Sequence, residues 1–313
     1  MDYSVLAYYV LYPFDNPKEE RDRHEKFLRT LDSKGRIYIA SQGVNAQLSL
    51  NNKDVEAYLS FLEKDERYKE ADVKIHPSSD HAFHKLSVKL RKELVAINQE
   101  VDLTKRGAHL SPKEWREAME KGDPNTIVLD VRNNYESCVG YFEGAIRPDI
   151  ETFREFPAFA KELSAKIDPS KTRVLMYCTG GIRCELYSPL LKDLGFKEIL
   201  QLKGGVIRYG LEEGEAHWRG KLFVFDDRLV IPISKENKET ITLCRFCQTS
   251  ADTYYNCANM DCNSLMLACS SCVEKERGCC QESCKAGRVR SIETKIACPK
   301  PFRKLSFDEK QKL

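Results

Sequence analysis

The distribution of cysteines is the feature that most constrains how this chain can fold. Ten of the 13 cysteines in the 313 residues lie between Cys244 and Cys298. A segment this short cannot bury enough apolar surface to be stable by itself, so it needs a covalent or metal cross-link. The sequence therefore predicts a cysteine-poor body followed by a small cysteine-rich module over residues 226–313.

Composition narrows the class of protein. With 42% hydrophobic and 31% charged residues the chain has a globular composition, which excludes collagen-like and disordered proteins. No apolar run approaches the ~18–20 residues that cross a bilayer, and no basic segment precedes the first apolar run at 5–14. We therefore expect no membrane association, no signal peptide and a cytoplasmic location. The net charge of +2 indicates no particular partner.

Residues 1–100 show the pattern of a ferredoxin-like α+β domain. Aromatic and β-branched residues dominate the expected strands, and apolar residues at helical spacing mark the expected helices. The order strand, helix, strand, strand, helix, strand is that of the ferredoxin-like fold. The expected strands are 4–11, 36–41, 44–50, 71–76 and 85–90, and the expected helices are 18–32 and 53–64.

From Leu110 onward the pattern changes to strands that alternate with helices, over a predicted domain of residues 101–225. Ser111, Pro112 and Glu114 have the spacing of a capped helix start. Such alternation predicts a parallel α/β sheet that is covered by helices on both faces. The strand-like runs are 125–131, 173–178 and 198–202, and a helical run covers 185–194.

One cysteine stands where a parallel sheet places its chemistry. Cys178 ends the run 173–178 and so lies at the carboxyl end of a strand, where open α/β folds bind ligands. Two glycines after it allow backbone N–H groups to turn inward as an anion-binding nest. A helix that begins near Arg183 adds its positive end, which lowers the pKa of a thiol and stabilises a thiolate or persulfide. The expected anion-binding loop is Thr179, Gly180, Gly181 and Ile182.

The neighbours of Cys178 narrow the chemistry further. Four residues separate it from Arg183, a loop shorter than the one that cysteine phosphatases wrap around a phosphate, so a phosphatase is disfavoured. Cys184 either resolves an oxidised Cys178 as a disulfide or is a buried helix cysteine. Asp130 and Arg132 follow the strand expected beside that of Cys178, and we expect them to form a structural ion pair. The alternative for Cys178 itself is a buried strand-end cysteine without a chemical role.

Four segments, in order along the chain, resemble the landmarks of rhodanese domains: 129–132, 143–146, the loop 178–183 and 202–205. The sequences YCTGGIRCE at 177–185 and TFREFP at 152–157 resemble one rhodanese family in particular, the bacterial tRNA uridine hydroxylases. The resemblance covers nearly the whole chain, because that family also has an N-terminal ferredoxin-like (acylphosphatase-like) domain and a cysteine-rich C-terminus.

This resemblance implies an enzyme that forms 5-hydroxyuridine at the wobble position of tRNA with molecular oxygen as co-substrate. It implies tRNA as partner and Cys178 as the reactive residue. A thiolate there can add to C6 of uracil and leave C5 electron-rich, with loop N–H groups and Arg183 stabilising the enolate. Two other functions stay open: a sulfurtransferase that takes a persulfide onto Cys178 from a small-molecule sulfur donor, and a non-catalytic RNA-binding protein. The oligomeric state also stays open.

The cysteine-rich module contains two CxxC pairs at a spacing close to that of zinc ribbons. We expect two structural zinc ions, each closed by four thiolates. Disulfides are the alternative, but they are rare in a reducing cytosol. The two expected ligand sets are Cys244, Cys247, Cys269 and Cys272, and Cys257, Cys262, Cys280 and Cys284, with Cys279 as the alternative to Cys280.

Two basic segments are candidates for contact with an RNA backbone. Residues 285–313 contain nine Lys or Arg and three Asp or Glu. Runs of this kind contact phosphates in nucleic-acid-binding proteins, although a solvated surface has the same composition. The second segment, at the end of the predicted first domain, consists of Lys85, Lys89, Arg91 and Lys92.

Overall fold

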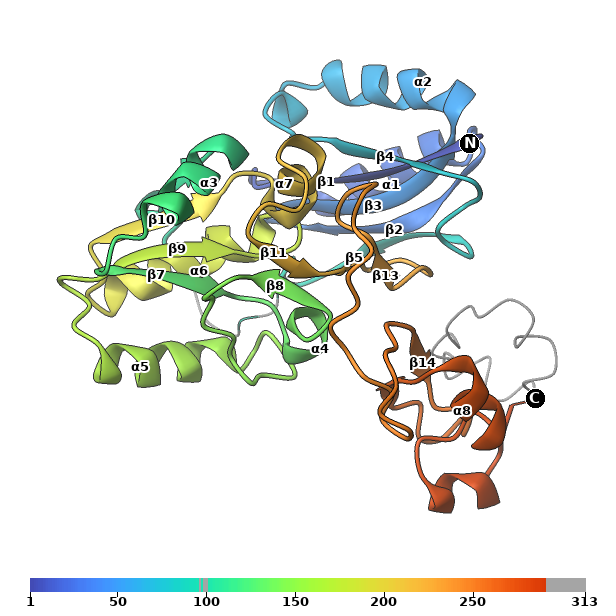
Figure 1. Ribbon diagram of the computed structural model, residues 1–313. Coiled ribbons are helices and arrows are strands. Elements are labelled where there is room, and N and C mark those ends of the chain that lie inside the picture. Colours follow the sequence, from blue (N-terminus) through green and yellow to red (C-terminus); the bar gives the residue numbers. More distant parts are fainter. Residues whose placement is uncertain (96, 98–100, 291–313) are drawn as a thin grey trace. The chain divides into compact units, whose positions relative to one another are not determined.

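A computed structural model describes residues 1–95, 97 and 101–290 of the chain (Figure 1). The chain divides into two compact units. The first combines residues 1–134 with 144–217, and the second combines 135–143 with the chain from 218 onward. Within the described residues, no helix has the length and apolar character that crossing a membrane requires.

The N-terminal part of the first unit is built on one five-stranded sheet in the order β4-β1-β3-β2-β5. The first four strands pair antiparallel, and β5 adds to the edge in parallel with β2. This is the predicted ferredoxin-like arrangement with one additional edge strand. Its elements are β1 (Tyr3–Val10), α1 (Pro17–Leu28), β2 (Ser33–Ala40), β3 (Gly43–Asn51), α2 (Asn52–Glu63), η1 (Glu66–Tyr68), β4 (Lys74–Ser78) and β5 (Leu86–Leu90).

The two faces of this sheet are different. Helices α1 and α2 cover one face and pack on each other, with Phe27 and Phe61 stacked at 4.2 Å between ring centroids. Alternate residues of β1, such as Leu6 and Tyr8, are buried in that core. The residues between them face the opposite side. Because Ala7 of β1 pairs with Lys74 of β4, the Lys74 side chain also lies on the side away from the helices.

The other part of the first unit contains the segments that resemble rhodanese domains and is called the rhodanese part below. It is a parallel sheet in the order β6-β10-β9-β7. Figure 1 shows α3 and α7 on one side of this sheet and α5 on the other, and α6 packs with α5, so both faces are covered as predicted. Ser111 and Glu114 form the predicted capping box of α3. The elements are η2 (Leu103–Lys105), β6 (Ala108–Leu110), α3 (Pro112–Lys121), β7 (Thr126–Asp130), α5 (Phe156–Lys166), β9 (Arg173–Tyr177), α6 (Ile182–Asp193), β10 (Glu198–Leu202) and α7 (Gly205–Glu212).

The core of the rhodanese part extends into the segment that precedes it. Val95 and Ile97, at the end of the predicted first domain, are buried with Val174 and Met176 of the central strand β9. The buried cysteines Cys178 and Cys184 belong to the same cluster. The segment between the two parts is therefore packed into the core of the rhodanese part.

The second unit consists of short strand pairs and small helices. The strands β8 and β11, β12 and β13, and β14 and β15 form three separate two-stranded sheets. The core around β14 and β15 is made largely of cysteines with Tyr255, Met266 and Val273. The elements are α4 (Asn134–Ser137), β8 (Gly140–Phe142), β11 (Trp218–Gly220), β12 (Leu222–Phe223), β13 (Val230–Ile231), β14 (Tyr254–Asn256), β15 (Leu265–Leu267), α8 (Ser270–Lys275) and η3 (Glu282–Ala286).

Candidate active site and cysteine clusters

Cys178 is the first residue after β9, a central strand of the parallel sheet, and the residue is 1% exposed. The helix α6 begins at Ile182, one residue before the predicted start. Gly181 caps it with φ of 105°, a conformation that side chains with a Cβ rarely adopt. Sequence reasoning therefore located the strand, the loop and the helix that together present this sulfur.

The loop after Cys178 has its carbonyl groups held outward. The N–H groups of Val206 and Ile207, in the first turn of α7, donate to the carbonyl oxygens of Cys178 and Thr179 at 3.0 and 3.1 Å. The carbonyl oxygen of Gly180 accepts from the Lys74 ammonium at 3.1 Å. On the inner side the Gly181 N–H donates to the Cys178 sulfur at 3.1 Å. This arrangement directs backbone donors to the sulfur.

Glycines at the start of α7 allow this close approach. Gly205 has φ of 66°, and a Cβ built on it would lie 2.6 Å from the Cys178 carbonyl oxygen and 2.7 Å from that of Thr179. A side chain at this position therefore forces the Cys178 loop away from α7. The segment 202–205, noted in the sequence only as a landmark, is thus the support of the Cys178 loop.

The environment of the sulfur favours a thiolate. Burial alone raises the pKa of Cys178, but the hydrogen bond from Cys184, the charge of Arg183 and the N–H groups of Arg183 and Gly181 outweigh it and lower the pKa to about 5. Burial and the hydrogen bond to Cys178 raise the pKa of Cys184 well above its usual value. The pair therefore consists of a thiolate at Cys178 and a thiol donor at Cys184.

Arg183 and the predicted ion pair of Asp130 with Arg132 are all buried near the Cys178 loop. Arg183 is 6% exposed, and its guanidinium lies 3.5 Å from the Thr179 hydroxyl. Asp130 and Arg132 form an ion pair at 2.6 Å with both side chains inaccessible to solvent. The Tyr177 hydroxyl donates to Asp130 at 2.7 Å, which ties this pair to the residue before Cys178. The ion pair is therefore structural and supports the end of β9.

Residues of the ferredoxin-like part also reach the loop, and sequence reasoning did not identify them. The Tyr9 hydroxyl donates to the Glu185 carboxylate on α6 at 2.8 Å, and the tyrosine ring lies against Gly181. Glu185 also contacts His109 at 2.9 Å. The alternation of β1 places Tyr9 away from its own core, a signal that is present in the sequence. What Tyr9 contacts there depends on how the two parts pack.

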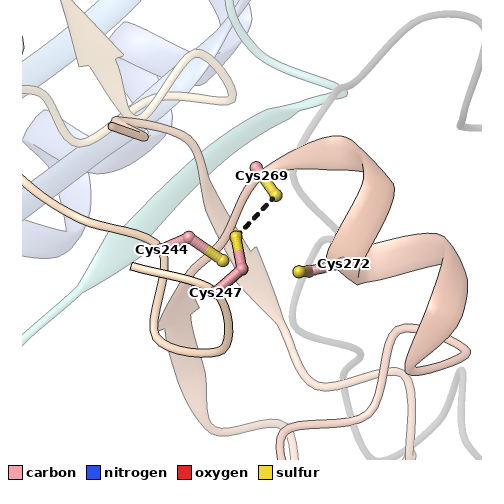
Figure 2. A group of neighbouring side chains, drawn as sticks. All are labelled: Cys244, Cys247, Cys269 and Cys272. Carbon is pink, nitrogen blue, oxygen red and sulfur yellow. Dashed lines mark hydrogen bonds between the residues drawn. The ribbon is translucent and has the colours of Figure 1, made fainter. Parts of the chain in front are cut away.

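Eight cysteines of the second unit form two groups of four. In each group the four sulfur atoms all lie within 4.8 Å of one another. Figure 2 shows the first group, with Cys272 on α8, Cys269 immediately before that helix, and the other two cysteines on the facing turn. Both groups coincide with the sets predicted from sequence, and Cys280 rather than Cys279 joins the second. The groups are Cys244, Cys247, Cys269 and Cys272, and Cys257, Cys262, Cys280 and Cys284.

The spacing of these sulfur atoms is compatible with four thiolates around one metal ion and is longer than a disulfide bond. The sulfurs of Cys247 and Cys269 are 3.6 Å apart, as are those of Cys262 and Cys280. A tetrahedron of thiolates around zinc, with Zn–S near 2.3 Å, has edges of about 3.8 Å, whereas a disulfide bond is about 2.05 Å long. Among the described residues no cysteine is part of a disulfide, and Cys298 lies outside them.

Of the two basic segments, the structure describes the one around β5 completely and the C-terminal one only up to residue 290. Lys85, Lys89, Arg91 and Lys92 are exposed on or beside the edge strand β5. The Arg91 guanidinium lies over the Tyr38 ring at 4.6 Å from its centroid. Most of the second segment, residues 291–313, lies outside the described residues.

Three family models match consecutive parts of the chain. Residues 3–94 match the UPF0176 acylphosphatase-like domain, residues 111–210 match the rhodanese-like domain, and residues 219–285 match the rhodanase C-terminal region. These matches agree with the fold described above, including the cysteine-rich C-terminal part.

Curated proteins resemble the chain over almost its full length. A Chlamydia trachomatis serovar D protein named tRNA uridine(34) hydroxylase is 50% identical over 306 residues, which are 97% of this chain and 93% of that protein. A Chlamydia felis protein of the same name is 49% identical over 311 residues, covering 98% and 95%. Among solved structures, the rhodanese-like domain of an Anabaena protein has 22% identity and a TM-score of 0.30, covering 36% of this chain and 78% of that one.

Proposed function

Because this chain belongs to the family of tRNA uridine(34) hydroxylases, we propose that it hydroxylates C5 of the wobble uridine of tRNA with molecular oxygen as co-substrate. The observation that carries the chemistry is Cys178, a buried thiolate surrounded by backbone donors and Arg183. A tRNA substrate supports a cytoplasmic location for this activity, since tRNA takes part in translation there.

The reaction begins when the Cys178 thiolate adds to C6 of the uracil ring. The C5–C6 double bond is conjugated to the C4 carbonyl, so the addition gives an enolate with negative charge shared between C5 and O4. The same groups that stabilise the thiolate, the loop N–H groups and the Arg183 guanidinium, are available to stabilise that charge. The electron-rich C5 then forms its bond to oxygen.

The electron balance requires a reductant. Addition of O₂ at C5 and protonation give a hydroperoxide, and a two-electron thiol reductant converts it to the C5 hydroxyl and water. Loss of the C5 proton and expulsion of the Cys178 thiolate from C6 then restore the double bond. The net reaction consumes uridine, O₂, two electrons and two protons, and yields 5-hydroxyuridine and water.

The substrate must reach a sulfur that is almost inaccessible. Cys178 is 1% exposed, and Gly180 and Ile182 are the partly exposed residues of its loop. A wobble base already lies in a single-stranded loop, so it can turn outward without breaking a base pair. Its entry requires local opening around Gly180. The exposed basic residues on β5 are suited to hold the RNA backbone during that step.

Isotope labelling tests the proposal directly. Purified protein is incubated with unmodified tRNA, a thiol reductant and oxygen-18 gas, and the nucleosides are analysed by mass spectrometry. We expect 5-hydroxyuridine that carries one heavy oxygen atom, and none when Cys178 is replaced by serine. Unlabelled product, or no product from any tRNA under these conditions, contradicts the proposal.

A sulfurtransferase is the second candidate, because the rhodanese-like domain and the stabilised thiolate also suit a persulfide. In that reaction thiosulfate gives its outer sulfur to Cys178 and leaves as sulfite. Mass spectrometry of the peptide with Cys178, after incubation with thiosulfate and no tRNA, would show the mass of one additional sulfur atom. Transfer of that sulfur to an acceptor at a rate above hydroxylation favours this candidate.

We also propose that each group of four cysteines holds a structural zinc ion. The support is the sulfur spacing of 3.6–3.7 Å within the groups and the small apolar core around them. Four thiolates complete a tetrahedral shell, so zinc there has no open position for substrate. The metal stabilises the fold of the second unit and takes no part in the chemistry at Cys178.

A further inference from the structure

Lys74 is a buried lysine that the proposed reaction leaves without a role. It is the first residue of β4 in the acylphosphatase-like part, and it is 1% exposed. Lysine is almost never fully buried unless its ammonium is paired. Here the ammonium lies 3.3 Å from the Asp72 carboxylate and 3.1 Å from the Gly180 carbonyl oxygen. It also lies 5.4 Å from the centroid of the Tyr9 ring.

The carbonyl group that Lys74 contacts belongs to the same peptide group as the N–H that reaches the sulfur. In a trans peptide the C=O and N–H bonds point in opposite directions. Gly180 O accepts from Lys74 on the outer side, and Gly181 N donates to Cys178 at 3.1 Å on the inner side. Holding the carbonyl therefore fixes the direction of the N–H. Two consecutive glycines do not fix this direction by themselves, because their backbone angles are unrestricted.

We propose that Lys74 is a positioning residue that holds the Gly180–Gly181 peptide with its N–H towards the Cys178 sulfur. Of the three carbonyls in this part of the loop, α7 of the rhodanese part anchors the first two, and Lys74 anchors the third. The acylphosphatase-like part thus completes the anion-binding loop of the rhodanese part. An effect of Lys74 on the rate of hydroxylation rests on the proposed function, whereas its effect on the pKa of Cys178 does not.

Electrostatics give the same contact a second effect. A cationic donor on the carbonyl polarises the peptide group and makes its N–H a stronger donor to the thiolate. The Lys74 ammonium and the Cys178 thiolate also attract each other directly. Burial lowers the pKa of Lys74, and the nearby Asp72 and Cys178 charges oppose that effect. Asp72 is itself held by an ion pair with Arg208 of α7.

The groups that influence the charge of Cys178 come from four elements and one adjoining segment. Those on α6 are Arg183, Cys184 and Glu185, and Tyr9 on β1 binds Glu185. Lys74 is on β4, Asp72 precedes it, and Arg208 is on α7. Of these, Lys74 is the group that binds the loop backbone through a carbonyl, so its replacement tests the positioning effect specifically.

The test measures the thiolate itself and needs no tRNA. The rate at which iodoacetamide alkylates Cys178 is followed against pH in the full-length protein. Trypsin cleaves after Arg173 and Arg183, so Cys178 and Cys184 fall in separate peptides that mass spectrometry distinguishes. The shape of the pH profile reports the pKa even when burial slows the reaction at every pH. The variants are Lys74→Met, which keeps the apolar stem, and Lys74→Gln, which keeps an N–H donor without the charge.

We expect Lys74→Met to raise the pKa of Cys178 by about one unit, which slows alkylation about fivefold near pH 5 and leaves it no slower near pH 9. Lys74→Gln gives a smaller shift in the same direction. Lys69→Met is the matched control, because Lys69 is exposed, pairs with Glu66 at 3.6 Å, and should leave the profile unchanged. Circular dichroism and thermal melting establish that each variant is folded.

A folded Lys74→Met variant with the wild-type profile overturns the proposal. If that variant does not fold, an unchanged profile in Lys74→Gln overturns it equally. The proposed function fails separately, through the absence of labelled 5-hydroxyuridine in the wild type. If the alkylation profile shifts in Lys74→Met but the wild type does not hydroxylate tRNA, the positioning role of Lys74 is supported and the proposed hydroxylase function is wrong.

Discussion

Cys178 lies in the loop that leads into α6 and Cys269 immediately precedes α8, yet their surroundings give the two thiols different chemistry. Around Cys178 are the Gly181 N–H, the Arg183 charge and a single thiol donor, Cys184. Around Cys269 are three further cysteines within 4.8 Å. Both thiols are acidic: hydrogen bonds from the Ser271 side chain and the Cys272 backbone lower the pKa of Cys269 to about 6.

The difference teaches that an acidic thiol is not by itself a catalytic one. A thiolate held by backbone N–H groups and one thiol donor still has a lone pair for attack on a carbon or sulfur electrophile. A thiolate with three other cysteines around it is suited to bind a metal ion, because one cation can balance the charges of all four. The comparison therefore depends on what lies within hydrogen-bond or bonding distance of each sulfur.

The largest expected effect is the loss of hydroxylation when Cys178 is replaced, and replacement of the neighbouring Cys184 is its comparison. We expect Cys178→Ser to reduce hydroxylation by more than about 10³-fold, the order of loss that follows removal of a nucleophile. The hydroxyl of serine is not ionised at neutral pH. Cys184→Ser keeps a hydrogen-bond donor to Cys178 and should retain much of the activity. A nucleoside assay measures both, and full activity of Cys178→Ser would remove the contrast on which the comparison rests.

The role of Gly205 in supporting the Cys178 loop is tested by replacing it and Gly214, which has nearly the same backbone conformation, with alanine. Gly205 and Gly214 have φ of 66° and 68°, but only a Cβ on Gly205 meets backbone atoms, since nothing lies within 4 Å of one on Gly214. Both alanine variants therefore bear a similar conformational cost of about 1–2 kcal/mol. We expect Gly205→Ala alone to displace the Cys178 loop and reduce activity on the order of a hundredfold. Equal activities of the two variants would contradict the role assigned to Gly205.

The proposed zinc ion in the first group of four cysteines is tested by replacing two of its expected ligands together. The variant Cys244→Ser with Cys247→Ser should lower the zinc content from two ions per chain to one and lower the thermal stability of the second unit. Elemental analysis under reducing conditions measures the metal. Cys279→Ser is the control, because Cys279 lies in the same module but outside both groups. A protein purified without metal, with disulfides among these cysteines, would show that the module is cross-linked covalently.

The smallest effects are expected from the basic residues on β5, which touch neither kind of cysteine. Neutralising Lys89, Arg91 and Lys92 to glutamine should weaken tRNA binding and flatten its log–log salt dependence by about one unit per lost phosphate contact. The alkylation profile of Cys178 and the zinc content should not change. Lys171→Gln is the control, because this exposed lysine lies far along the chain from β5. Unchanged salt dependence in the triple variant would assign these charges to solvation alone.

The sequence by itself determined the local features of both sites. A strand-like run that ends in a cysteine and is followed by two glycines and a helix predicts a short loop whose N–H groups can turn inward, so Cys178 was identifiable from the order of residues. The two CxxC pairs and the cysteines around them likewise predicted two groups of four, but the sequence left open whether Cys279 or Cys280 joins the second group. The period-two alternation of strands is a further sequence signal for the outward faces of Tyr9 and Lys74, although no role was predicted for either residue.

Only the tertiary structure decided what those outward-facing residues contact. Lys74 and Gly180 are far apart in the sequence, and the contact between them depends on how one sheet packs against the end of another. Local propensities say nothing of such packing, since it follows from the shapes of two surfaces that form only after each part has folded. The same holds for Gly205, whose role appears when α7 is placed against the Cys178 loop. The sulfur is thus specified locally, whereas the donors that stabilise its charge are assembled from distant parts of the chain.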